Sequence, residues 1–173
     1  TTNTVPIVLA EPVTTGGGSG KNAGPVTTTM VELGSGKKTL SPANFPSKNS
    51  IYRATCSGNG DITFSAATYS NFVLVSNCNL KFANGVILDG TILATTSTSA
   101  TSVSASHVQM GLNDSCAPGG GSIILTMGGF EAAAGLQGYG AQILAGGDIQ
   151  FAANANGIEG VSFIAEGRID GTS

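Results

Sequence analysis

The chain has 173 residues, of which 26 are Gly and 10% are charged, and its formal net charge is -3 at pH 7. This length suits one ordinary domain with its own core, and the near absence of charged pairs at helical spacing excludes a helical bundle or coiled coil. Seven Lys and Arg residues, spread singly, give no electrostatic basis for binding nucleic acid or an anionic membrane.

Residues 1–50 are predicted to form an irregular tail and linker that caps or covers the rest of the chain. They contain one short apolar run, Val5 to Leu9, and a Gly-rich stretch at 16–20 that is typical of linkers. The chain starts with Thr and has neither a signal-peptide pattern nor an apolar run long enough to span a membrane. We therefore expect a processed piece, with any membrane anchor outside this chain.

Residues 51–173 repeat with a period of about 20 residues, which is the pattern of a solenoid. A first class of strands has apolar residues at its central positions and recurs at residues 51–54, 73–75, 92–94, 123–125, 143–145 and 163–165. A second class alternates apolar and polar residues and recurs at 61–64, 79–82, 107–110, 129–132, 148–151 and 168–171. Stacked rungs bury like residues over like residues, and parallel crossovers are right-handed. We predict an all-β domain over 51–173, a right-handed parallel β-helix (β-solenoid) of about six rungs.

Period-2 alternation sets which residues of the second class face inward. Phe82 is expected inside the solenoid and its neighbour Lys81 outside. The expected inward column is Ile62, Leu80, Val108, Phe130, Ile149 and Ile169, and the outward one is Thr63, Lys81, Gln109, Glu131, Gln150 and Asp170. One interval, between Ala94 and Ile123, exceeds the period by about 12 residues. Protruding loops are expected there, at 95–105 and 113–121.

The first strand class has apolar residues on both faces, so one ladder must point outward. We expect this outward ladder to be Leu74, Leu93, Ile124, Leu144 and Ile164, with Val73, Ile92, Ile123, Ile143 and Phe163 inside. Soluble monomers rarely leave such a patch exposed. The ladder is therefore expected to be covered by apolar residues of the N-terminal third (5–9, 26–33 and 40–45), or by a protein partner or second subunit.

Three cysteines without metal-ligand spacing favour an oxidising, extracytoplasmic compartment. Cys56 and Cys78 end equivalent strands on neighbouring rungs, where their Cα atoms come within bridging distance. We predict a disulfide between Cys56 and Cys78. Cys116 is then free, or pairs with a thiol outside this chain.

Residues suited to catalysis or metal binding are few and scattered. His107 is the only histidine, which leaves few hydrolase or zinc sites possible. Asp61 and Asp148 fall in one column several rungs apart, and Asp148 is expected to pair with Arg168. Asp114 is one carboxylate in a loop, so a turn role is favoured over a calcium site. We predict no cofactor, no metal and no small-molecule substrate. The mixed charges of the outward column also argue against an ice-binding array.

The stretches LVSNCNLKFANGVILDGTILATTSTS, GLNDSCAPGGG, LAGGDIQFAANANGIEGVSFIA and GRIDGTS lie between Cys56 and Ser173. Together they resemble the C-terminal region of TadE/TadG-like proteins of bacterial tight-adherence (Flp) pilus systems. The resemblance covers about two thirds of the chain. It implies an extracytoplasmic pilus accessory protein, and it supplies no catalytic residues. Family members carry an N-terminal membrane anchor, which this chain lacks, and further sequence beyond residue 173.

We therefore predict a non-enzymatic, extracytoplasmic structural or accessory component of a bacterial pilus or cell-surface apparatus, with a protein partner or self-association. One alternative is a self-associating surface filament or adhesin subunit, in which the outward ladder is buried between chains. A second alternative is a polysaccharide-active enzyme. That enzyme requires a cleft with two carboxylates, or with a carboxylate and a base, on neighbouring rungs.

Overall fold

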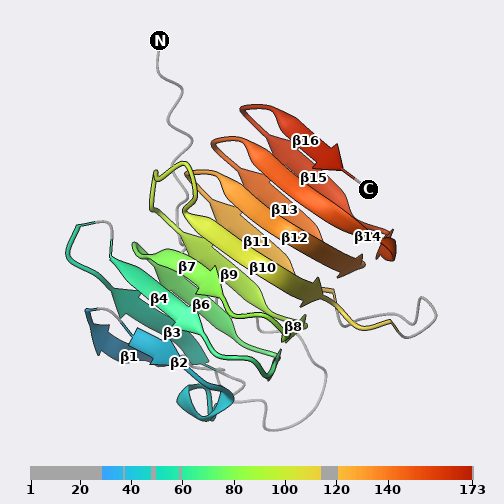
Figure 1. Ribbon diagram of the computed structural model, residues 1–173. Helices are drawn as coiled ribbons and strands as arrows, with labels where there is room; N and C mark the ends of the chain where they lie inside the picture. Colours follow the sequence, from blue (N-terminus) through green and yellow to red (C-terminus); the bar gives the residue numbers. More distant parts are fainter. Residues whose placement is uncertain (1–28, 37, 48–49, 59, 114–120, 173) are drawn as a thin grey trace, which may run out of the picture.

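The fold is a parallel β-solenoid whose strands stack along one axis (Figure 1). The computed structural model describes residues 29–36, 38–47, 50–58, 60–113 and 121–172. The coil is right-handed, as parallel crossovers almost always are. The predicted fold class is therefore confirmed, while the N-terminal run 5–9 and Cys116 lie outside the described residues.

Sheet A is the seven-stranded sheet at the back of the view in Figure 1. Its order is β1 (Thr29–Ser35), β3 (Ser50–Thr55), β6 (Val73–Ser76), β9 (Ile92–Thr95), β11 (Ile123–Thr126), β13 (Gln142–Ala145) and β15 (Ser162–Ala165). All neighbours pair in parallel. The six later strands coincide with the predicted first class.

Sheet B lies in front and contains β2 (Lys38–Leu40), β4 (Asp61–Phe64), β7 (Asn79–Phe82), β10 (Val103–Met110), β12 (Phe130–Tyr139), β14 (Ile149–Glu159) and β16 (Ile169–Thr172). The long strands β10 and β12 change register at residues 105–107 and 132–135. Beyond this shift β10 pairs with β8 (Val86–Asp89), which also pairs with β5 (Thr68–Ser70). Each middle rung therefore has a third side, which the two-class pattern did not predict.

The solenoid begins before residue 51, where the predicted domain boundary lay. β1 pairs with β3 and β2 pairs with β4, so residues 29–40 add a first rung. Leu40 is fully buried, and Val31 and Leu33 pack against the core. Phe45 follows the short 3-10 helix η1 (Pro42–Asn44) and stacks on Phe72 at 3.9 Å between ring centroids. These residues form the first rung and its cap, so the prediction that they cover an outward ladder was wrong.

Tyr69 fixes the N-terminal cap through its hydroxyl. The buried ring donates its O–H to the carbonyl of Leu40 at 2.7 Å, and the same hydroxyl lies 3.1 Å from the carbonyl of Ser65. Burial raises the pKa of Tyr69, because a phenolate loses its hydration there. The first rung is thereby tied to the second.

The second strand class needs one correction of register. Leu80 of β7 pairs with Val103, not with Val108, and Val103 pairs in turn with Phe130. Residues 107–110 belong to the third side, where Val108 pairs with Val86. The prediction for Phe82 and Lys81 is confirmed, since Phe82 is buried and the Lys81 side chain is 47% exposed. The segment 107–110 was misplaced because it carries the same alternation as the true strands.

The first strand class was assigned to the wrong face. Leu74, Leu93 and Ile124 are each 0% exposed and belong to the core, whereas Ile92 and Ile123 beside them face outward and are half-buried. The predicted alignment of the strands is also wrong by one residue after β11. Ile124 pairs with Ile143, and Ile143 with Phe163, so Leu144 and Ile164 do point outward as predicted.

Residues 96–102 form a corner of the solenoid, not the protruding loop that was predicted. Ser97 is 6% exposed and Ser102 is 0% exposed, and β10 begins directly afterwards at Val103. The second predicted loop, over 113–121, falls mostly outside the described residues.

Candidate interaction surface

The outward side of sheet A is an almost continuous apolar surface, which we call the sheet A outer face. It is made by alternate residues of seven strands, because successive side chains of a strand point to opposite faces. Its apolar members are Met30, Ile51, Val73, Val75, Ile92, Ala94, Ile123, Leu125, Leu144 and Ile164. The two at its ends, Met30 and Ile164, are 46% and 56% exposed. The other eight are half-buried.

The apolar character is greatest in the middle of the sheet. On β6, β9 and β11 both outward positions are apolar, and these three strands are the third, fourth and fifth of the seven. Each outer strand has one polar outward residue instead. Glu32 and Arg53 form an ion pair of 2.7 Å at the N-terminal end, and Gln142 and Ser162 are exposed at the C-terminal end. An apolar centre with a polar rim is the usual anatomy of a protein interface.

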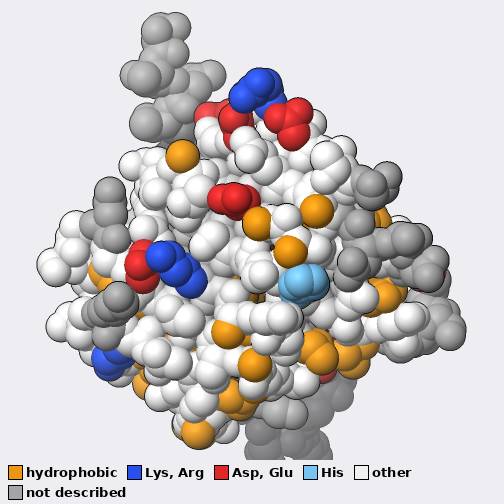
Figure 2. Space-filling view, viewed as in Figure 1, with side chains coloured by type: hydrophobic (Ala, Val, Ile, Leu, Met, Phe, Trp, Pro, Cys, Tyr) orange, Lys and Arg blue, Asp and Glu red, His pale blue; other side chains and the backbone are white. Residues whose placement is uncertain are grey.

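The outward side of sheet B has a different composition. Its column along the strand centres is Thr63, Lys81, Ser104, Glu131, Gln150 and Asp170. Figure 2 shows this side, where charged groups are scattered over a surface that is mostly uncharged. Lys81 Nζ lies 2.8 Å from Asp61 Oδ2, and Arg168 lies 3.6 Å from Asp148 as predicted. The carboxylates suspected of catalysis are therefore each paired with a cation.

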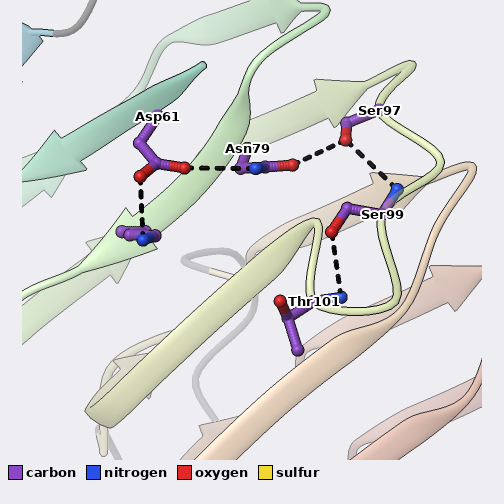
Figure 3. A network of polar contacts seen from close by, with 6 residues as sticks. Asp61, Asn79, Ser97, Ser99 and Thr101 are labelled. Carbon is purple, nitrogen blue, oxygen red and sulfur yellow. Dashed lines mark hydrogen bonds and ion pairs between the residues drawn. The ribbon is translucent and has the colours of Figure 1, made fainter. Parts of the chain in front are cut away.

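Asp61 also begins a chain of side-chain hydrogen bonds along one corner (Figure 3). Asn79 donates to Asp61 Oδ1 at 3.1 Å, and Ser97 donates to Asn79 Oδ1 at 2.6 Å. The backbone N–H of Ser99 continues the chain to Ser97 Oγ at 3.3 Å, and that of Thr101 to Ser99 Oγ at 3.4 Å. This network joins successive rungs and holds the corner at residues 96–102 against the solenoid.

A ladder of buried hydroxyls closes the sheet A strands, and sequence reasoning missed it. Ser76, Thr95 and Thr126 occupy the last position of β6, β9 and β11 and are nearly inaccessible to solvent. Thr95 Oγ1 donates to the carbonyl of Cys78 at 2.6 Å and accepts the N–H of Ser97 at 3.1 Å. Ser76 makes the equivalent bonds to Ala54 and Cys78. The detectable signal was a hydroxyl residue at the end of VLVS, ILAT and IILT.

The disulfide lies beside this ladder. Cys56 and Cys78 are bonded as predicted, with their Cα atoms 5.3 Å apart, and both are buried. The bond links the second rung to the third. Cys116 and Asp114 lie outside the described residues, so their predicted roles stay predictions.

His107 lies in a shallow pocket of about 350 Å³ on the third side of the solenoid. Asn84, Gln109 and Gln137 are among its lining residues, and His107 Nδ1 is buried without a hydrogen-bond partner among the described residues. No carboxylate lines this pocket. In the part of the chain that the structure describes, no three His, Cys, Asp or Glu side chains form a group that could hold a metal ion.

Comparison with known proteins identifies the family but adds no named function. A family model described as a domain of unknown function, DUF7867, matches residues 16–173, so the chain belongs to this family. No curated protein and no solved structure matches the chain. Among the described residues, no helix has the length and apolar character to cross a membrane.

Proposed function

We propose that this protein is a non-enzymatic structural component of a bacterial cell-surface assembly, and that it packs against another protein through the sheet A outer face. The observation that carries the proposal is the uninterrupted apolar centre of that face, on β6, β9 and β11. A solenoid needs only one face of each strand for its core. The outward apolar residues are therefore not required by the fold, and burying them is favourable at roughly 25 cal/mol per Å².

The polar residues support a structural role. Asp61 holds Lys81 and Asn79, and Asp148 accepts the backbone N–H of Arg168 at 2.9 Å besides pairing with its guanidinium. These carboxylates tie neighbouring rungs together. A polysaccharide-active enzyme would use such groups on substrate instead, with two carboxyl groups on either side of a bond.

An extracytoplasmic location is part of the proposal. The Cys56–Cys78 disulfide is a bond that persists in oxidising compartments and is rare in reducing ones. A pilus is the assembly implied by the TadE/TadG resemblance, and the family match adds no link to pilus proteins. The proposal therefore specifies a surface assembly and treats a pilus as one form of it.

Site-specific photocrosslinking in the source organism tests this function. A photoreactive amino acid at Leu125, in the centre of the sheet A outer face, should crosslink to protein in the cell-envelope fraction. The same residue placed at Ser104, on the outward side of sheet B, is the matched control and should crosslink far less. Equal labelling from both positions, or a chain found in the cytoplasm with reduced cysteines, would contradict the proposal.

A further inference from the structure

We propose that the occupant of the sheet A outer face is a second copy of this chain, so that two solenoids pack sheet on sheet into a two-fold symmetric dimer. This inference rests on the proposed function and names the partner. It starts from the position of the apolar block Val73, Val75, Ile92, Ala94, Ile123 and Leu125.

The block is centred on the middle of the sheet. β9 is the fourth of seven strands, with β6 and β11 on either side. A two-fold axis that passes over β9 therefore lays the apolar block of one copy on the same block of the other, whether the two solenoid axes run parallel or antiparallel. A patch that matches itself in this way is what an isologous interface requires.

The side chains in the block suit sheet-on-sheet packing. They are aliphatic and carry no polar atoms, and packed sheets interdigitate such residues about 10 Å apart. The polar residues of the face lie at its ends, where Glu32 pairs with Arg53 and where Gln142 and Ser162 are exposed. In a two-fold dimer these groups stay at the solvent-accessible rim, so no charge is buried at the centre.

The dimensions set the expected strength. Seven strands about 4.8 Å apart and four residues at about 3.3 Å each give a flat area of roughly 380 Å². Side-chain relief and the rim increase it, so two copies together bury on the order of 1,000 Å², at the lower limit for a specific interface. We therefore expect a reversible dimer that forms with rising concentration.

Analytical ultracentrifugation of the full chain tests the inference. Between about 1 and 100 µM, the mass should rise from 17.1 kDa toward twice that value. Ile92→Lys should weaken dimerisation by about tenfold or more, because two lysines meet near the axis. Ser104→Lys, on the opposite side of the solenoid, should dimerise like the wild type. Far-UV circular dichroism and an intact disulfide show that each variant is folded, and Ala94→Arg replaces Ile92→Lys if that variant fails this check.

Two outcomes would overturn the dimer. A wild-type chain that stays monomeric to about 100 µM excludes it, and if removal of residues 1–15 then produces a dimer, the occupant is the N-terminal segment. A dimer that Ile92→Lys leaves unchanged uses another surface. Either result leaves the proposed function standing if Leu125 still crosslinks to an envelope protein. A sheet A dimer in solution, formed by a chain that cells keep in the cytoplasm with reduced cysteines, sustains the inference and removes the function.

Discussion

The outward sides of sheets A and B differ although both belong to the same coil. Around the strand centres sheet B alternates buried and outward residues, with Phe82 buried and Lys81 exposed and paired with Asp61. The centre of sheet A is apolar on both sides, with Leu93 buried and Ile92 outward. The parallel pairing and rung spacing are common to both sheets, so the fold does not explain the difference. The apolar outer residues of sheet A are the basis of our proposal that another protein covers this surface.

Truncation in sheet B should give the largest contrast between the two sides of one strand. Phe82→Ala removes a ring that lies 5.0 Å from that of Phe64 between centroids. Its cavity should lower the free energy of unfolding by about 3–5 kcal/mol, measured by urea titration. Lys81→Ala removes only a partly exposed ion pair and should cost less than about 1 kcal/mol. Equal effects would show that the strand register is wrong.

The same experiment in sheet A tests the corrected assignment of its faces. Leu93→Ala should cost about 2–5 kcal/mol, because the side chain is fully buried in the core. Ile92→Ala should cost clearly less when measured at concentrations where the chain is monomeric, since that side chain is already partly exposed. A larger loss of unfolding free energy for Ile92→Ala than for Leu93→Ala would show that Leu93 lies on the outer face.

The Cys56–Cys78 disulfide lies on neither sheet face and ties two rungs at a corner. Replacing Cys56 and Cys78 by Ser should cost about 3 kcal/mol, since the bond closes a loop with a sequence separation of 22. Thiol counting of the denatured, non-reduced wild type should find one free thiol in each chain, that of Cys116. Three free thiols would show that the disulfide does not form.

The smallest expected effect concerns the end of the sheet A core. Thr95→Val removes a hydroxyl that donates to Cys78 and accepts from Ser97, and it leaves both groups buried or partly buried. The expected cost is about 1–3 kcal/mol, measured by thermal unfolding. Thr63→Val, an outward position on β4, is the control and should change stability little. Similar losses for the two variants would argue against a structural hydroxyl ladder.

The sequence predicted the solenoid because its period survives in both strand classes. It could not predict which residues of the sheet A strands point inward. Successive residues such as Ile92 and Leu93 are both aliphatic, so no apolar–polar alternation distinguishes the two faces. The segment 107–110 was misplaced because its alternation imitates that of 79–82, while its true partner is β8.

The same limit applies to the candidate site. The existence of an outward apolar surface followed from the non-alternating apolar pattern of the first strand class, and Leu144 and Ile164 were placed on it correctly. The residues at its centre, such as Ile92 and Leu125, could be placed on this surface only once the strand register was known. The buried hydroxyls were not predicted because Ser and Thr are equally common in exposed turns, and only contacts with the neighbouring rung distinguish the two settings.

Photochemical carbene labelling of both sheets in one sample tests most directly whether the sheet A outer face is covered by another protein. Labelling of Ile123 and Leu125 on sheet A is compared by mass spectrometry with that of Glu131 and Gln150 on sheet B, at about 1 and 100 µM. We predict that labelling of the sheet A residues falls as concentration rises, while that of the sheet B residues stays constant. Sheet A residues that remain equally labelled at both concentrations would contradict the proposed packing.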